Sequence, residues 1–366
     1  MRAPADFLAE RIDAGDIPSA SWIIANAEGV ISEGSAGSAV ILPSRVAASR
    51  ETLYDLASLT KPLVTTLLAL LLRREAGFTF GDRAARFLPE FDRLDKRDIT
   101  LSNLLTHTSG LPDWAPLYVK GASIPEYLRQ IREKELLFRP AALVLYSDLG
   151  FIALGAILER IGGSPLDRLA SELIFERVGA LACFRPGPDR RPRVAATEEA
   201  CNYERVKAGT AAAGYRGWRE GVIRGEAHDQ NAFAAGGVAG HAGLFGTARD
   251  VYLIAREALA SEPKLIREDE MPLIREAQSG TSSEPRSLAY RINRLEDGGP
   301  DPSSAPGVAL SPATFGHNGF TGTSVWIDPE AGRLFILLTN RVHPRVRPEI
   351  DMNALRREFH RLALQA

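Results

Sequence analysis

Strand, turn and strand patterns lie near both ends of this 366-residue chain. Residues 20–25 and 30–32 flank a turn at 26–29, and residues 323–327 and 333–338 flank a turn at 328–332. Strand-forming runs on either side of Asn, Gly or Pro residues predict a β-hairpin at each place. The fold is therefore expected to draw one sheet from both ends of the chain.

Between the hairpins the patterns are mainly helical. We expect helices there at residues 102–105, 124–132, 149–161 and 250–259, and a first helix at residues 5–14, before the first hairpin. Leu355, Phe359 and Leu362 line one face of a closing helix. Residues 296–312, which are rich in Gly, Pro and Ser, predict a loop that leads back to the sheet. The fold class is α+β: an antiparallel sheet flanked by helices, with a mainly helical lobe inserted.

A chain of this length with 45% hydrophobic residues can bury a large core, and we expect a single domain over residues 1–366. The patterns place an α/β lobe at about 1–65 and 247–366 and a mainly helical lobe at about 66–246. An active site is expected in the cleft where the lobes meet.

Charge and composition argue against several classes of partner. The net charge of −2 gives no general reason to bind nucleic acid or an anionic membrane. The longest apolar run, residues 63–72, is too short to span a bilayer, and the first residues do not read as a secretory signal, so a cytoplasmic location is expected unless the chain was trimmed. Cys183 and Cys201 are interpreted as free structural thiols.

Ser58 and Lys61 stand three residues apart at the start of the apolar run. On a helix these positions share a face, so the Lys61 amine can reach the Ser58 hydroxyl. Apolar surroundings would lower the pKa of Lys61 and free some amine to act as a base, and backbone N–H groups at the helix start could stabilise an oxyanion. The pattern alone is weak, because a helix cap followed by a solvated lysine looks the same.

Three further segments follow in order: 104–112 (LLTHTSGLP), Tyr146-Ser147-Asp148 and His317-Asn318-Gly319. With Ser58-x-x-Lys61 they resemble the serine β-lactamase and penicillin-binding-protein superfamily, especially class C β-lactamases, family VIII esterases and D-stereospecific peptidases. The resemblance runs from about Ile17 to about Asp328. It implies the β-lactamase/transpeptidase-like form of the α+β fold.

The resemblance implies a role for each matching residue. Ser58 would be the acylated nucleophile, Lys61 its proton acceptor and Tyr146 a second base or relay. The backbone N–H groups of Ser58 and Phe320 would bind the oxyanion. The remaining motif residues would line the substrate site: Asp148, His317, Asn318 and Gly319. Taken singly, Tyr146 could instead be a core aromatic residue and His317-Asn318-Gly319 a simple turn.

Two positions depart from the family pattern. Asp148 replaces the usual asparagine, and a carboxylate there would favour charged Lys61 and shift weight to Tyr146. His317 replaces the usual lysine and should be mostly neutral at pH 7, so the fixed cation for a substrate carboxylate is lost. These departures favour esters, or amides whose recognition does not depend on a carboxylate, over penicillins.

The other histidines are assigned structural roles. The spacing of His228 and His241 fits no usual zinc pattern, so we expect hydrogen-bonding residues in a glycine-rich loop and no metal. His107 should hold its loop in place, and His343 and His360 are expected at the surface. The chain has no GxSxG motif, so an α/β-hydrolase serine site is not available.

The sequence therefore predicts a serine hydrolase that acts through an acyl-enzyme on a small ester, amide or lactam, without a metal or organic cofactor. An alternative remains open, a penicillin-binding sensor or receptor on the same fold that is acylated, or binds its ligand, without turnover. The sequence does not predict the oligomeric state.

Overall fold

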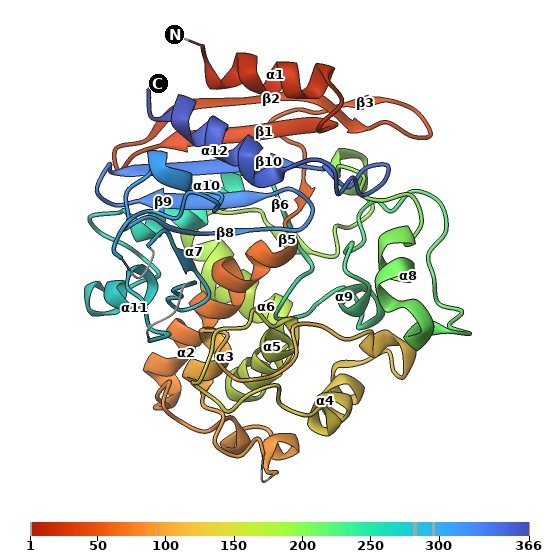
Figure 1. Cartoon of the computed structure of the whole chain (residues 1–366), viewed down its shortest axis with the longest axis vertical. Coiled ribbons are helices and arrows are strands. Elements are labelled where there is room, and N and C mark those ends of the chain that lie inside the picture. Colours follow the sequence, from red (N-terminus) through yellow and green to blue (C-terminus); the bar gives the residue numbers. More distant parts are fainter. Residues whose placement is uncertain (1, 94, 281–283, 295–296, 366) are drawn as a thin grey trace.

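The computed structural model describes residues 2–93, 95–280, 284–294 and 297–365. A seven-stranded antiparallel sheet has the order β3-β2-β1-β10-β9-β8-β7. It lies in the upper half of Figure 1, with most of the helices below it. The strands are β1 (Ser19–Ala25), β2 (Val30–Val40), β3 (Val46–Ala47), β7 (Arg291–Ile292), β8 (Phe315–Asn318), β9 (Ser324–Asp328) and β10 (Arg333–Thr339). Both predicted hairpins are confirmed.

The pairing of β1 with β10 joins the two ends of the chain, with Ile23 opposite Ile336. Every residue of β1 is buried, because both faces of the sheet are covered. Successive side chains alternate between the faces: Ile23 packs in the core shared with the helical lobe, and Trp22 and Ile24 pack in a second core on the other face. The sheet from both chain ends is thus a central layer.

Helices α1 (Pro4–Asp13) and α12 (Met352–Ala363) cover the second core. Leu355, Phe359 and Leu362 are all buried there, as the closing-helix pattern predicts. On the opposite face, α10 (Ala248–Ala255) packs on β1 and β10, and the 3₁₀ turn Arg256–Ala258 extends it. The predicted helix at 250–259 is therefore an α-helix that tightens at its end.

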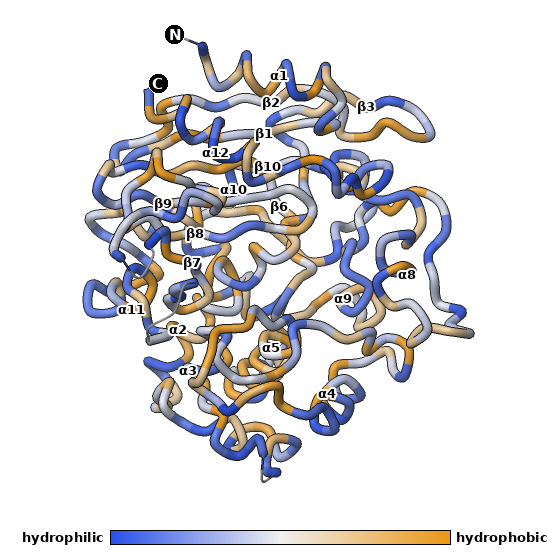
Figure 2. The backbone as a smooth tube through the Cα atoms, viewed as in Figure 1, coloured by the Kyte–Doolittle hydropathy of each residue, from blue (hydrophilic) through white to orange (hydrophobic). Residues whose placement is uncertain are grey.

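The remaining helices form the mainly helical part of the chain. They are α2 (Leu67–Ala76), α3 (Leu101–Leu105), α4 (Ile124–Glu133), α5 (Asp148–Gly162), α6 (Leu166–Ala170), α7 (Glu176–Val178), α8 (Asn202–Ala208), α9 (Gln230–Ala234) and α11 (Met271–Arg275). Helix α5 runs through the interior and is coloured as hydrophobic in Figure 2, whereas α4 is coloured mainly as hydrophilic and buries only Tyr127, Leu128 and Ile131. A small sheet of β4 (Tyr54–Asp55), β6 (Leu244–Gly246) and β5 (Cys183–Phe184) lies beside them.

In the predicted loop 296–312, residue 296 lies outside the described residues, and the rest contains a 3₁₀ turn at Gly307–Ala309. The two cysteines are free, as expected, with Cys201 buried. The lobe boundaries stay a prediction.

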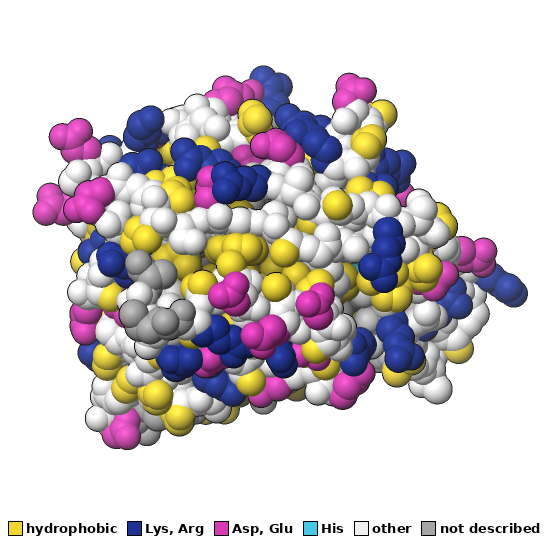
Figure 3. All heavy atoms as spheres, turned by 90° about the horizontal axis from the view of Figure 1, so that it is seen from above, with side chains coloured by type: hydrophobic (Ala, Val, Ile, Leu, Met, Phe, Trp, Pro, Cys, Tyr) yellow, Lys and Arg dark blue, Asp and Glu magenta, His cyan; other side chains and the backbone are white. Residues whose placement is uncertain are grey.

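The surface carries both signs of charge. In the view from above, Lys and Arg side chains are interspersed with Asp and Glu (Figure 3), in keeping with the small net charge. No single described helix is long and apolar enough to cross a bilayer. The bent pair Asp148–Gly162 and Leu166–Val178 meets the length and composition criteria, but residues 149–158 are buried in the core.

The surface prediction for His343 and His360 is wrong. His343 is 3% exposed, and its ring contacts the Thr197 carbonyl and the Ile41 N–H. His360 is fully buried on α12, where Nδ1–H donates to the Ala305 carbonyl at 3.2 Å. Both rings replace water with backbone partners from distant parts of the chain, which lets a polar side chain enter a core.

Protonation of His360 is expected to destabilise the fold. Burial and the nearby Arg356 lower the pKa of His360 to about 3, whereas an unfolded histidine has a pKa near 6.5. The neutral form of His360 contributes fully to the free energy of unfolding above about pH 6.5, and this contribution is lost as the pH falls toward 3. Between pH 7 and about pH 5 the wild type should lose about 2 kcal/mol more unfolding free energy than His360→Asn, which keeps a donor and does not titrate. Urea unfolding at both pH values measures this, and equal losses would contradict it.

Candidate active site

Ser58 lies on the 3₁₀ turn Ala57–Leu59, directly after β4. Ala57 has φ +47°, in the left-handed region that residues with a Cβ rarely adopt. Its N–H donates to Asp55 Oδ1 at 2.8 Å, so a buried carboxylate holds this backbone in place. Asp55 was missed by the sequence reasoning, although it stands three residues before Ser58.

The helix after Ser58 is not α-helical at its start. Lys61–Thr66 is a π-helix, and α2 begins only at Leu67. Pro62 has no N–H, so it cannot donate to the Ser58 carbonyl as an α-helix would require. The segment is nevertheless buried as predicted, and π-helical turns are frequent at functional sites.

The hydroxyl of Ser58 is contacted by both predicted partners. Its Oγ accepts from Lys61 Nζ at 3.0 Å and from the Tyr146 hydroxyl at 2.7 Å. Lys61 is completely buried, which excludes the solvated lysine of the simpler interpretation. Tyr146, 88 positions further along the chain, is therefore brought to the Ser58 and Lys61 pair.

Lys61 is held as an ammonium. Its Nζ lies 3.0 Å from the His241 carbonyl and 2.7 Å from Asp148 Oδ1, as well as 3.0 Å from Ser58 Oγ. These acceptors match the three N–H donors of an ammonium. Burial alone would lower the pKa of Lys61, but Asp148 and Tyr146 outweigh it and the pKa is raised. The expected depression of this pKa is thus wrong, and the expected effect of Asp148 is confirmed.

His107 packs against the Tyr146 ring. The ring centroids are 4.5 Å apart, and His107 Nδ1 accepts the N–H of Ser147 at 3.0 Å. Ser147 in turn caps α5, which starts at Asp148. Burial and nearby cations keep the pKa of His107 well below its ordinary value, so the ring stays neutral. His107 is the structural histidine that the sequence predicts, and it orients Tyr146.

The His317-Asn318-Gly319 segment ends β8 beside the Ser58 turn. A Cβ on Gly319 would lie 2.7 Å from the Leu56 carbonyl oxygen, so only glycine fits this approach. Thr321 and Thr323 donate to the Asp55 and Leu56 carbonyls at 2.7 and 3.1 Å. The segment therefore joins the sheet to the residues that carry Ser58, and it is more than a turn.

His317 is neutral, as expected. Its Nδ1–H donates to the Asn318 carbonyl at 2.8 Å, and burial, Lys61 and Arg286 hold the pKa of His317 well below its ordinary value. Asn318 Oδ1 accepts from the Trp326 indole at 3.0 Å. Phe320 is the next residue after the triplet and lines the cleft together with Ser58.

Although position 317 carries no cation, the cleft has other positively charged side chains. Ser58, Tyr146 and Phe320 line a cavity of about 330 Å³ on the strand side of the cleft. The same cavity is lined by Arg286, Arg291, Arg341 and Arg356. No local pattern marks these arginines, because they come from the segment before β7, from β7 itself, from the residues after β10 and from α12.

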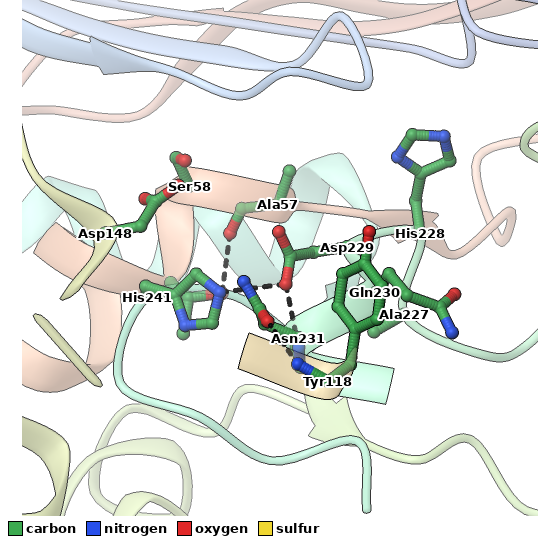
Figure 4. A network of polar contacts seen from close by, with 12 residues as sticks. Ala57, Ser58, Tyr118, Asp148, Ala227, His228, Asp229, Gln230, Asn231 and His241 are labelled. Carbon is green, nitrogen blue, oxygen red and sulfur yellow. Dashed lines mark hydrogen bonds and ion pairs between the residues drawn. The ribbon is translucent and has the colours of Figure 1, made fainter. Parts of the chain in front are cut away.

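The glycine-rich loop holds Lys61 from the other side. Asp229 Oδ1 accepts from His241 Nε2 at 2.9 Å, and His228 Nε2 lies 3.3 Å from Glu198. Figure 4 shows Asp229 facing His241, with Ser58 and Asp148 on one side and His228 on the other. The histidines are hydrogen-bonding residues, as expected. Among the described residues no group of three or more His, Cys, Asp or Glu side chains is placed to hold a metal ion.

The sequence matches the Beta-lactamase family over residues 5–358. The chain belongs to the beta-lactamase family. It is 29% identical over 373 residues to a protein of Escherichia coli (strain K12) named putative D-alanyl-D-alanine carboxypeptidase, covering 93% of this chain and 82% of that protein. The family confirms the resemblance drawn from the motifs and makes this chain a serine hydrolase of small ester, amide or lactam substrates.

Solved structures of other beta-lactamase-like proteins share the fold. EstCE1, described as a hydrolase with promiscuous acyltransferase activity, aligns with a TM-score of 0.73 and 21% identity over 98% of this chain and 97% of its own. A penicillin-binding protein homologue from Caulobacter crescentus aligns with a TM-score of 0.73 and 18% identity over 98% and 95%. The predicted α+β fold class of this beta-lactamase-family chain is confirmed.

Proposed function

We propose that the protein hydrolyses small carboxylic esters and amides in two steps, with Ser58 as the acylated residue. The observation that carries the proposal is the pair of short contacts from Lys61 and Tyr146 to Ser58 Oγ. Attack by Ser58 on the substrate carbonyl gives an acyl-enzyme, and water then releases the acid. The backbone N–H groups of Ser58 and Phe320 are assigned to the oxyanion.

The protonation states of Lys61 and Tyr146 decide which group acts as the base. Lys61 is an ammonium at rest, and burial raises the pKa of Tyr146, which the Lys61 charge offsets only in part. Both groups donate to Ser58 Oγ, so neither can accept a proton from it. Either Lys61 or Tyr146 must first lose a proton from this trio of Ser58, Lys61 and Tyr146 before Ser58 can give up its own. The trio titrates as a unit, and its active form becomes more populated as the pH rises.

An adduct experiment tests the proposal. The protein is mixed with 4-nitrophenyl acetate, and intact-mass spectrometry with peptide mapping follows the adduct while released nitrophenol is recorded. We expect continuous release with a transient acetyl group on Ser58. A persistent Ser58 adduct without turnover would favour the receptor alternative, and acetylation elsewhere, or no turnover and no adduct, would refute the proposal.

Replacement of Asp148 by asparagine is expected to move the pH dependence to lower pH. The Asp148 charge raises the pKa of Lys61, so removing it lets the active form appear at lower pH. The rising limb of kcat/KM for 4-nitrophenyl acetate should shift down by roughly one pH unit or more, measured between about pH 6 and pH 9. Coincident limbs would show that the Lys61 proton does not control the rate.

A further inference from the structure

Two cavities of opposite charge meet at Ser58. Ser58, Tyr146 and Phe320 line both of them. The strand-side cavity has four arginines and no Asp or Glu among its described lining residues. The helix-side cavity, of about 200 Å³, is lined by Asp113, Asp148, Glu204 and Asp229, with Lys207 as the one Lys or Arg among its described lining residues. The lining side chains are therefore positively charged on the strand side of Ser58 and mainly negatively charged on its helix side.

On the strand side, Arg286 and Arg291 form ion pairs with Glu284 and Asp301, whereas Arg341 and Arg356 have no Asp or Glu ion-pair partner among the described residues. Arg356 is 4% exposed, and its nitrogens donate only to the Thr323 carbonyl and the Asn353 amide oxygen, with Nε unpaired among the described residues. Arg341 donates to the Phe320 carbonyl at 2.8 Å. Burial and Arg341 lower the pKa of Arg356 to about 9. A buried charge without a partner is costly, so an anionic ligand group would be stabilised here.

On the helix side, two of the four lining carboxylates, Asp229 and Glu204, influence each other. Asp229 is ionised: burial opposes its charge, but His241 and the Ala232 N–H lower its pKa. Glu204 is 5% exposed, and burial together with the Asp229 charge raises its pKa to about 7. Asp148 is already neutralised by Lys61. The negative charge on Asp229 and Glu204 remains, and an incoming ammonium group would stabilise it.

Aromatic rings in the same cavity add to this preference. Lys207 Nζ lies 4.1 Å from the centroid of the Trp114 ring, so one ammonium already sits at this wall. Phe320 and Tyr203 pack against each other with their rings tilted and their centroids 4.7 Å apart, and both line the cavity. Ring faces beside carboxylates favour organic cations.

We propose that the substrate is a small dipolar molecule, with an ammonium on its acyl part and a carboxylate on its leaving group, as in a dipeptide. A bond between two amino acids necessarily carries the ammonium on the carbonyl side and the carboxylate on the amine side. The acyl part therefore occupies the helix-side cavity and the leaving group the strand-side cavity. This inference rests on the proposed function of Ser58.

The reaction balances without a further reactant. The Ser58 oxygen bonds to the acyl carbon, the C–N bond breaks, and the leaving amine takes up the proton that Ser58 gives up. Water then adds to the acyl carbon, the serine ester bond breaks, and the free acid and the Ser58 hydroxyl are restored. The products are two amino acids.

Four matched anilides test the inference. Alanyl and N-acetylalanyl compounds, each as the 4-nitroanilide and the 3-carboxy-4-nitroanilide, vary the ammonium and the carboxylate independently, in both D and L forms. We expect the compound with both charges to have the highest kcat/KM in at least one stereochemical series, with each charge worth at least about tenfold. 4-Nitrophenyl acetate reports the basal reaction of Ser58.

Variants assign each preference to its cavity. Glu204→Gln should weaken the preference for the ammonium and keep that for the carboxylate, and Arg356→Gln should do the reverse. Arg341→Gln replaces Arg356→Gln if the latter does not fold. Arg129→Gln and Glu220→Gln, at exposed positions, are the matched controls.

The outcomes separate the two proposals. Equal turnover of the four anilides, or no turnover of any, with 4-nitrophenyl acetate still hydrolysed at Ser58, would overturn the dipolar substrate and leave the proposed function standing. Preferences that survive both variants would also overturn it. Failure of every compound, 4-nitrophenyl acetate included, to acylate Ser58 would overturn the proposed function itself.

Discussion

Ser58→Ala is expected to lower kcat/KM for 4-nitrophenyl acetate by about 10⁴-fold or more. The substitution removes the Ser58 oxygen that both Lys61 and Tyr146 contact, so no acyl-enzyme can form. When several catalytic residues act as a unit, loss of the nucleophile alone typically removes nearly all of the catalysis that the unit provides. Steady-state rates corrected for spontaneous hydrolysis measure the loss.

Cys183→Ala is the control for this result. Cys183 is a partly buried free thiol on β5, and burial raises its pKa, so it is a poor nucleophile at neutral pH. The variant should retain wild-type turnover. If Ser58→Ala and the wild type hydrolysed the ester equally fast, Ser58 could not be the nucleophile.

Lys61→Met is expected to reduce kcat/KM by about 10³-fold or more. It removes a direct donor to Ser58 and the charge that offsets the raised pKa of Tyr146, so neither proton path to Ser58 remains favourable. It also leaves the Asp148 carboxylate without its ion-pair partner. Activity per folded molecule, with the folded fraction taken from thermal unfolding, is the quantity to measure.

Lys96→Met provides a matched control for the loss of a buried lysine. Lys96 is also fully buried and pairs with an aspartate, Asp95, at 2.6 Å, but it does not line the cleft. Both variants should lower stability, because both remove a paired buried charge. Only Lys61→Met should lose activity per folded molecule, and an equal loss in Lys96→Met would assign the effect to folding.

The ordered motifs were enough to predict the central site. Ser58, Lys61 and Tyr146 each stand in a local pattern, and the order of those patterns matches the family, so their convergence could be expected across 88 residues. Asp148 could also be placed near Lys61, and its effect on the pKa followed from Coulomb's law. The sheet built from both ends was predictable because strand periodicity and turn residues are local signals.

The missed features depend on partners that the local sequence does not show. Arg356 and Arg341 belong to different elements, and only the packing of α12 beside the sheet brings them to the strand-side cavity. His360 entered the core because the Ala305 carbonyl, 55 positions away, accepts its N–H. The π-helix after Ser58 likewise reflects Pro62 together with contacts to the residues before β6.

The pairing of β1 with β10 has a consequence for the order in which the enzyme can assemble. Ser58 is synthesised early, but β1 has no neighbour on that side until β10 has left the ribosome, and the Gly319 segment that faces the Ser58 turn also comes late. Contacts between residues so far apart close large loops and form slowly. A nascent chain would therefore carry its nucleophile for most of its synthesis without the Phe320 backbone N–H that is assigned to the oxyanion.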